Sequence, residues 1–125
     1  MAKKVLLIED SDFVRATFLN VLTAGGFQVV VAKEGQEGIV AVTKEKPDLI
    51  LLDLMMPVMD GFKVLSFLKS DPKIADIPVI VLSGKGNSEE IQKAISLGAK
   101  DFLVKSTTPP KKVLEKVVFY LSPPK

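Results

Sequence analysis

Short apolar segments alternate with mixed polar stretches along the whole chain. The apolar segments occupy residues 5–8, 27–32, 49–52, 78–82 and 102–104. Most of them contain no polar residue, and runs of this kind are typical of strands that are buried on both faces, as in parallel sheets. The pattern therefore predicts a sheet whose strands are covered on both sides.

Between these segments, apolar residues recur every three or four positions, as on the buried face of a helix. The first such stretch carries Val14, Phe18, Val21 and Leu22, and it is preceded by Ser11, a suitable N-terminal cap. Four more helices are predicted around residues 39–42, 64–68, 91–95 and 113–121.

Residues that favour helix starts stand in front of two of these stretches. Asn87 and Glu90 have the spacing of a capping box. Pro109 and Pro110 suit the first turn of the last helix. Strand and helix thus alternate strictly, which predicts an α/β fold with a doubly wound, five-stranded parallel sheet and helices on both faces. We expect residues 1–125 to form a single domain.

The composition narrows the possible chemistry. The 125 residues include no cysteine and no histidine, which excludes disulfides, thiol catalysis, histidine bases and His/Cys zinc sites. The formal net charge of +2 gives no reason to expect nucleic acid or a membrane surface as a partner. Because no apolar run is long enough to cross a bilayer, we expect a cytoplasmic location.

Polar residues stand where four of the five predicted strands end. They are Glu9 and Asp10, Asp53, Ser83 and Lys105. In an open parallel α/β sheet the carboxyl ends of the strands lie at one edge, and ligands bind there. We therefore expect these side chains to converge, although they are far apart in the sequence.

The three carboxylates would repel one another at this edge unless a cation lay between them. Oxygen ligands select a hard cation, and Mg²⁺ with several retained waters suits such a set. Mg²⁺, Lys105 and the Ser83 hydroxyl would together hold a phosphoryl group. Asp53 would then be the nucleophile that forms an aspartyl phosphate.

Each of these residues also has an ordinary explanation. An aspartate after a strand, such as Asp53, is often a turn or cap residue. Glu9 and Asp10 can cap the first helix, Ser83 can belong to a turn, and Lys105 can be a solvated strand end. The combination of complementary chemistry at four strand ends favours a site over these separate explanations.

Four segments resemble the receiver domain of two-component response regulators, the family of the chemotaxis response regulator. They are VLLIEDSDFVR, PDLILLDLMMPVMDGF, IPVIVLSGKG and GAKDFLVKS. The resemblance extends from Lys3 to about Leu121, and it implies the flavodoxin-like strand order 2-1-3-4-5. It also implies phosphorelay signalling, in which a sensor histidine kinase or a phosphotransfer protein passes a phosphoryl group to an aspartate.

The resemblance implies Asp53 as the phosphoacceptor and Mg²⁺, or Mn²⁺, as the cofactor. Asp10 is similar to the direct metal ligand of the acid pair, and Glu9 to the acid that acts mainly through water. The backbone carbonyl of Met55 is implied as another ligand, together with Asp53.

The remaining implied roles concern the switch. Ser83 is similar to the hydroxyl that moves toward the phosphoryl group, Phe102 to the aromatic switch, and Lys105 to the lysine that pairs with the acyl phosphate. The face of the fourth helix, fifth strand and fifth helix would then change its affinity for a downstream protein. We expect no direct DNA binding by this chain, either as a stand-alone receiver or as a fragment of a longer regulator.

Two features are specific to this chain. Lys105 is followed by Ser106, where the family usually has proline, often in a cis bond. Since a cis bond without proline costs about 3–4 kcal/mol, we expect a trans bond here. Met55 and Lys85 flank the path of a hydrolytic water, and a thioether is a poor group to orient it. We expect a signalling switch and not an enzyme, one that catalyses only its own phosphorylation and its own slow dephosphorylation.

Other classes of protein fit less well. A flavin protein of the same sheet order needs a phosphate-cradling loop after the first strand, where this chain has Glu9 and Asp10. A phosphatase of the haloacid dehalogenase type needs a second acid at Met55. The segment Ser83–Gly86 is not a P-loop. A receiver that serves as a constitutive protein-binding module, never phosphorylated, remains an alternative.

Overall fold

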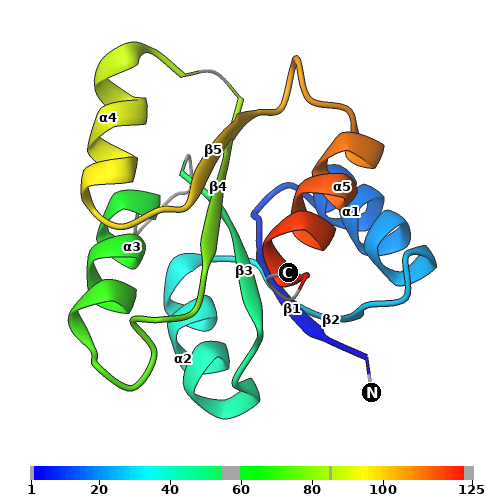
Figure 1. Cartoon of the computed structure of the whole chain (residues 1–125), viewed down its shortest axis with the longest axis horizontal. Helices are drawn as coiled ribbons and strands as arrows, with labels where there is room; N and C mark the ends of the chain where they lie inside the picture. Colours follow the sequence, from blue (N-terminus) through cyan, green and yellow to red (C-terminus); the bar gives the residue numbers. More distant parts are fainter. Residues whose placement is uncertain (1, 55–59, 85, 123–125) are drawn as a thin grey trace.

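The computed structural model describes residues 2–54, 60–84 and 86–122, in which strands and helices alternate along the chain (Figure 1). The strands of the described part are β1 (Lys4–Ile8), β2 (Gln28–Ala32), β3 (Leu49–Asp53), β4 (Val79–Ser83) and β5 (Asp101–Val104). They form one parallel sheet in the order β2-β1-β3-β4-β5. The predicted fold class and strand order are confirmed.

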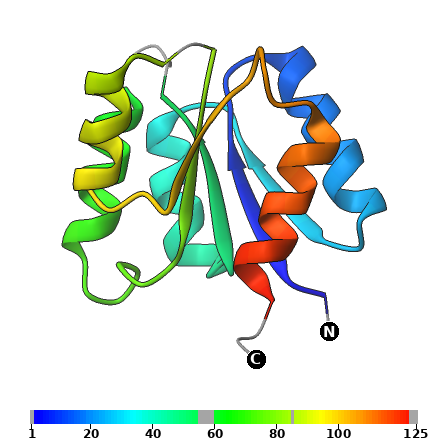
Figure 2. The same ribbon diagram turned by 45° about the horizontal axis from the view of Figure 1, so that its top comes forward.

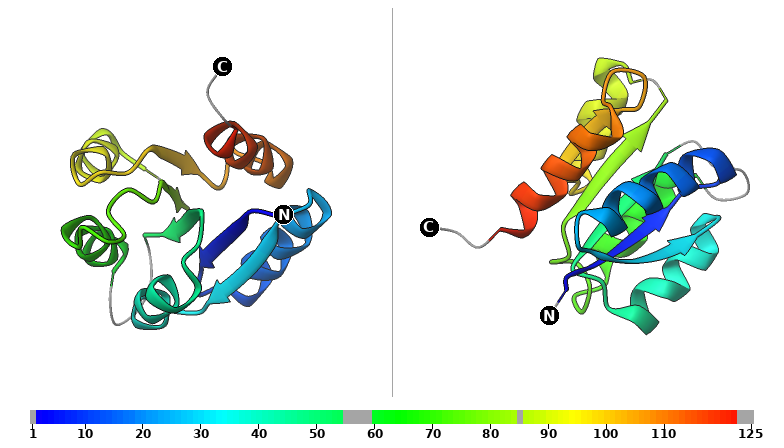
Figure 3. Two further views of the ribbon diagram at one scale, coloured as in Figure 1. Left: turned by 60° about the horizontal axis from the view of Figure 1, so that its bottom comes forward. Right: turned by 90° about the vertical axis from the view of Figure 1, so that its right-hand side faces the viewer.

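Helices cover both faces of this sheet, as Figure 3 shows in its left-hand view along the layers. The helices are α1 (Asp12–Ala24), α2 (Gly35–Glu45), α3 (Gly61–Ser70), α4 (Ser88–Ser96) and α5 (Pro110–Leu121). Helices α1 and α5 lie on one face, and α2, α3 and α4 lie on the other.

The interior positions of the strands are apolar, because helices cover both faces of the sheet. In β1, Val5 and Leu7 belong to the core cluster under α1 and α5, whereas Leu6 and Ile8 belong to the cluster under α2, α3 and α4. These side chains are completely buried. Strand β1 lies between β2 and β3, so it is also covered along both edges. Two hydrophobic layers therefore hold β1 in the centre of the domain.

The caps expected from the sequence are formed. The Ser11 hydroxyl accepts a hydrogen bond from the Val14 N–H at 3.3 Å, and the Asn87 side chain accepts one from the Glu90 N–H at 2.9 Å. Helix α5 begins at Pro110, as predicted. These contacts satisfy N–H groups that have no partner inside a helix. They fix where α1 and α4 begin relative to the strand ends.

The carboxyl ends of the strands lie at one end of the molecule. In Figure 2 the carboxyl ends of β1, β3, β4 and β5 are at the top, and the end of α5 is at the bottom. The edge that the sequence analysis selected is thus formed by four strand ends on the same side. No described helix combines the length and the apolar character that crossing a bilayer requires.

A polar network joins β5 to α5. The Tyr120 hydroxyl donates a hydrogen bond to Asp101 Oδ2 at 2.9 Å, and the Lys116 amine lies 3.6 Å from the same oxygen. Burial of the phenol raises the pKa of Tyr120 above its ordinary value of 10.0, and the hydrogen bond to the Asp101 carboxylate raises it further. The folded protein therefore favours the neutral phenol.

Asp101→Asn is expected to move the pKa of Tyr120 down, because it removes the negative charge beside the phenol. The chain has one tyrosine and no tryptophan, so phenolate absorbance reports on Tyr120 alone. Because the pKa of Tyr120 is higher in the folded than in the unfolded protein, the neutral phenol stabilises the folded state. This stabilisation is fully present below pH 10.0, and it is lost as the pH rises through the folded-state pKa. An unchanged titration midpoint in the variant would contradict this account.

Candidate functional site

The predicted site residues meet at one edge of the sheet. Glu9 and Asp10 directly follow β1, Asp53 is the last residue of β3, Ser83 is the last residue of β4, and Lys105 directly follows β5. Their convergence follows from the parallel order of the strands, because each strand delivers its last residue to the same edge. The sequence prediction of their placement agrees with this geometry.

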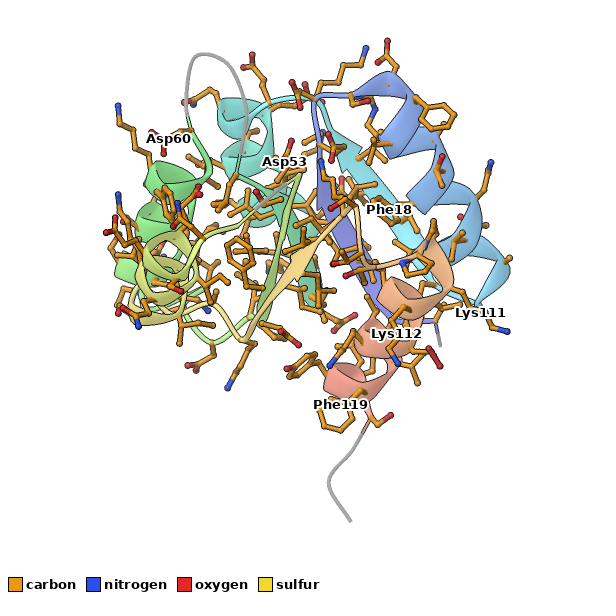
Figure 4. The ribbon with its side chains drawn as sticks, turned by 90° about the horizontal axis from the view of Figure 1, so that it is seen from above. Phe18, Asp53, Asp60, Lys111, Lys112 and Phe119 are labelled. Carbon is orange, nitrogen blue, oxygen red and sulfur yellow. The ribbon has the colours of Figure 1, made fainter. Side chains whose placement is uncertain are left out.

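Three carboxylates form the acidic part of the site. Oxygen atoms of Glu9, Asp10 and Asp53 all lie within 4.8 Å of one another. Glu9 and Asp53 are buried, whereas Asp10 is exposed. Figure 4 shows Asp53 at the opposite end of the molecule from Phe119 of α5. A set of carboxylate oxygens that is open to solvent on one side suits a hard divalent cation that keeps some of its waters.

Lys105 supplies a positive charge to this cluster. Its Nζ lies 2.5 Å from Glu9 Oε1 and 3.4 Å from Asp53 Oδ1. The amine therefore bridges the acid pair and the aspartate at the end of β3. One lysine among three carboxylates leaves the cluster with excess negative charge, which a bound cation would offset.

The Glu9 side chain is held on both of its oxygens. Oε1 accepts from the Lys105 amine, and Oε2 accepts from the Ser11 N–H at 3.0 Å. The Glu9 N–H donates to the Ala32 carbonyl at 3.0 Å, which continues the ladder between β1 and β2. A buried carboxylate needs such partners, because burial without them is costly. Glu9 is thus fixed in both backbone and side chain.

Ser83 lies on β4, the strand next to β3, and Phe102 lies on β5, one strand further along the sheet. The Ser83 side chain is buried at the end of β4, and the Ser83 carbonyl accepts from the Lys105 N–H at 2.7 Å. Phe102 is half-buried and packs against the cluster under α2, α3 and α4. A Cβ placed on Gly86 would lie only 2.5 Å from the Phe102 ring, so the ring touches the backbone that leads into α4.

The loop after β5 has the geometry expected from its sequence. None of the described peptide bonds is cis, so Lys105 and Ser106 are joined by a trans bond, as predicted. The Thr107 N–H donates to the Val104 carbonyl at 3.1 Å, which closes a tight turn around Ser106. Lys105 reaches the two carboxylates from this turn.

Gly61 lies directly against the backbone that carries Asp53, and the sequence analysis did not identify this role. A Cβ at Gly61 would lie 2.6 Å from the Asp53 carbonyl oxygen, so only glycine fits. The Gly61 N–H donates to the Leu54 carbonyl at 3.0 Å. Met55, the expected carbonyl ligand, and Lys85, which with Met55 led to the expectation of slow dephosphorylation, lie outside the described residues.

Arg15 is a second residue that sequence reasoning missed. Its Nη1 donates to the Glu9 carbonyl at 2.9 Å and to the Asp10 carbonyl at 3.4 Å, and its Nη2 bonds the Asp12 carboxylate. The signal in the sequence is its position one helical turn after the cap Ser11, which directs a long side chain back toward the preceding loop.

Comparison with known proteins places this arrangement in a family. The model of the response regulator receiver domain matches residues 5–117. The chain belongs to the receiver domain family. The resemblance noted in the four sequence segments is thereby confirmed, and this receiver domain is a signalling module of the two-component type.

Individual relatives agree with this assignment. The receiver domain is 42% identical over 102 residues to a gliding motility regulatory protein of Myxococcus xanthus. The matched residues make up 82% of this chain and 13% of that protein. It also spans about half the length of the phosphate regulon regulators that it matches. The curated relatives are therefore longer proteins, of which this chain corresponds to one part.

Solved receiver structures share the whole fold. Chemotaxis protein CheY4 of Vibrio cholerae superposes with a TM-score of 0.90 at 28% identity, covering 97% of this chain and 100% of that one. The phosphorylated cyanobacterial phytochrome response regulator RcpA superposes with a TM-score of 0.86 at 31% identity, covering 100% and 98%. The receiver assignment thus rests on both sequence and fold.

Proposed function

We propose that this receiver domain accepts a phosphoryl group on Asp53 from the phosphohistidine of a sensor histidine kinase or a phosphotransfer protein. The observation that supports this most directly is the position of the Asp53 carboxylate. It ends β3 with the Lys105 amine 3.4 Å away and with oxygens of Glu9 and Asp10 within 4.8 Å. The proposal treats residues 1–125 as one domain, because all described strands share one sheet.

In the proposed reaction an Asp53 oxygen attacks the phosphorus atom of the donor. The new P–O bond forms as the P–N bond to the donor imidazole breaks, and the imidazole nitrogen keeps the electron pair and takes up a proton. Catalysis of this kind rests on positioning and on neutralising charge. The Lys105 amine is close enough to Asp53 to pair with an oxygen of the transferred group. The Ser83 hydroxyl would donate a further hydrogen bond.

The acid cluster fits a divalent cation, as judged from its oxygen ligands and its excess negative charge. Glu9, Asp10 and Asp53 would hold Mg²⁺ or Mn²⁺, with the Met55 carbonyl as the ligand implied by the resemblance. Such an ion, when bound, would neutralise charge on the phosphoryl oxygens. The receiver's own residues supply the remaining contacts, namely the buried Glu9 and the amine of Lys105.

The phosphodonor would dock beside the site on α1 and the loop before α5. A hollow of about 190 Å³ adjoins Lys105 there, and it is lined mostly by apolar side chains, among them Phe13, Phe18 and Pro110. Phe13 is strongly exposed for an aromatic residue. An exposed aromatic next to a hollow is typical of a protein-binding surface.

The output would use α4, β5 and α5. Ile95 on α4 and Val118 and Phe119 on α5 are exposed apolar side chains on these elements. Phe102 belongs to β5 and contacts the backbone before α4 at Gly86. Phosphorylation would bias an existing equilibrium of Ser83 and Phe102 and so change the affinity for a downstream protein. This proposal includes no DNA contact by the chain, a cytoplasmic location, and slow self-dephosphorylation.

Wild-type protein is expected to gain one phosphoryl group when it is treated with acetyl phosphate and Mg²⁺. The reason is that a small acyl phosphate can replace the protein donor once the site supplies positioning and charge. Intact-mass spectrometry measures the adduct, and an excess of EDTA over Mg²⁺ is the control that should remove it. A folded protein that gains no adduct in either sample would instead support the constitutive protein-binding module.

A further inference from the structure

Arg15 makes contacts that the proposed phosphoryl transfer does not explain. Its guanidinium lies beneath the loop between β1 and α1 and bonds three acceptors: the Glu9 carbonyl, the Asp10 carbonyl and the Asp12 carboxylate. The two carbonyls belong to the acid pair itself. The side chain of Arg15 thus holds the backbone from which two of the three site carboxylates project.

An ordinary surface ion pair does not account for this arrangement. The Arg15 side chain is only 12% exposed, whereas the Asp12 side chain that pairs with it is 91% exposed. Surface pairs with one fully solvated partner contribute little. The bond from the guanidinium to the Glu9 carbonyl is part-buried, whereas the bonds to the Asp10 carbonyl and the Asp12 carboxylate are exposed. Solvent therefore screens the bond to the Glu9 carbonyl least.

The residue type at this position matches the geometry. Arg15 is the one arginine among the 17 basic residues of the chain. A planar guanidinium presents several N–H donors in a fixed fork, while a lysine amine on a flexible stem is a single point of contact. Bonding two successive carbonyls and a carboxylate together requires the fork.

Glu9 and Asp10 differ in the number of contacts, apart from those with Arg15, that hold them in place. Glu9 is buried and its carboxylate bonds the Ser11 N–H and the Lys105 amine. Asp10 is exposed, so packing does not fix its direction. The bond from Arg15 to the Asp10 carbonyl restrains the peptide group of this residue. Restraining a ligand residue through its neighbours is how proteins tune the affinity of a metal site.

We propose that Arg15 is a positioning residue for the acid pair. By fixing the peptide groups of Glu9 and Asp10, it sets the affinity of the site for a divalent cation. This rests on the proposed function, in which the acid cluster binds Mg²⁺.

The test is a calorimetric titration with Mg²⁺ alone, in the absence of any phosphodonor, on the wild type, Arg15→Gln, Arg15→Lys and Asp12→Asn. Arg15→Gln is expected to weaken Mg²⁺ binding about tenfold, the range typical when an outer partner of a metal ligand is removed. Arg15→Lys keeps the positive charge and N–H donors but lacks the planar fork, so its Mg²⁺ affinity is expected to lie between those of the wild type and Arg15→Gln. Asp12→Asn removes the ion pair but keeps the carbonyl contacts, so it is expected to bind like the wild type.

The outcomes separate the two proposals. If the wild type binds no Mg²⁺, the proposed metal site fails and Arg15 has nothing to position. If the wild type binds and Arg15→Gln binds equally well, only the inference about Arg15 is overturned. Circular dichroism and a urea titration of each variant identify the folded fraction. If Arg15→Gln does not fold, wild-type affinity in a folded Arg15→Lys overturns the inference, and weakened affinity supports it.

Discussion

Asp53→Asn is expected to abolish the phosphoryl adduct that forms with acetyl phosphate and Mg²⁺. The amide has the shape of the carboxylate but lacks its negative charge, so it cannot act as the nucleophile. It also removes one oxygen ligand from the acid cluster. Because Asp53 is buried next to Lys105, the loss of the nucleophile and the loss of the ligand oxygen both occur within the site. Intact-mass spectrometry of the variant, under conditions that label the wild type, measures the effect.

Asp60→Asn is the matched control for this experiment. Asp60, labelled with Asp53 in Figure 4, comes directly before α3, and its side chain accepts a hydrogen bond from the Lys63 N–H at 3.0 Å to cap that helix. Asparagine caps a helix as well as aspartate does, so α3 should be unaffected. We expect full labelling of Asp60→Asn. Labelling of Asp53→Asn to the wild-type level would place the acceptor on another residue and refute the assignment.

Sequence patterns predicted the sheet well because its strands are buried on both faces. Residues 5–8, 49–52 and 78–82 are apolar throughout, and all of them except Pro78 lie in strands of the described structure. The ends of the strands were predicted from the change to polar residues, and the same polar residues predicted the position of the site. In a parallel sheet this single rule brings Asp53 and Lys105 to one edge without any knowledge of the pairing register.

Details within the site could not be predicted because they depend on tertiary contacts. The sequence shows that Lys105 follows a strand, but not that its amine lies nearer to Glu9 than to Asp53. The hydrophobic pattern does not single out Gly61, because only glycine fits against the backbone that packs on it, and that packing is a tertiary contact. The pattern does not single out Arg15 either, because its bonds to the preceding loop depend on the angle at which α1 leaves β1.

Strand boundaries show the same limit at smaller scale. Asp53 and Ser83 are polar residues at which an apolar run stops, yet each is the last paired residue of its strand. Asp101 is polar and begins β5, where it bonds Tyr120 from α5. The hydrophobic pattern alone would place these polar residues outside the strands. Their contacts are with other elements of the fold, which the pattern does not show. These polar strand ends join the sheet to the site and to α5.

Lys105→Met is expected to lower the free energy of unfolding by about 3 kcal/mol at neutral pH, a typical cost of removing one partner of a buried ion pair. The Glu9 side chain is only 1% exposed, and its Oε1 lies 2.5 Å from the Lys105 amine. Methionine keeps most of the side-chain volume but leaves three clustered carboxylates without their lysine. Urea denaturation of wild type and variant measures the difference.

The control and a double variant decide whether this loss comes from the acid cluster. Lys112→Met makes the same chemical change on α5, where the lysine is 59% exposed and its amine is 4.0 Å from Glu115 (Figure 4), so it should cost at most about 0.5 kcal/mol. Glu9→Gln removes the buried charge that Lys105→Met leaves unpaired, so the double variant should be more stable than Lys105→Met alone. If Lys105→Met lowers the free energy of unfolding no more than Lys112→Met does, solvation of Glu9 and Asp10 compensates for the loss of the lysine. Lys105 would then have no structural role in holding Glu9 and Asp53 together, and its position in the site would matter only for the transferred phosphoryl group.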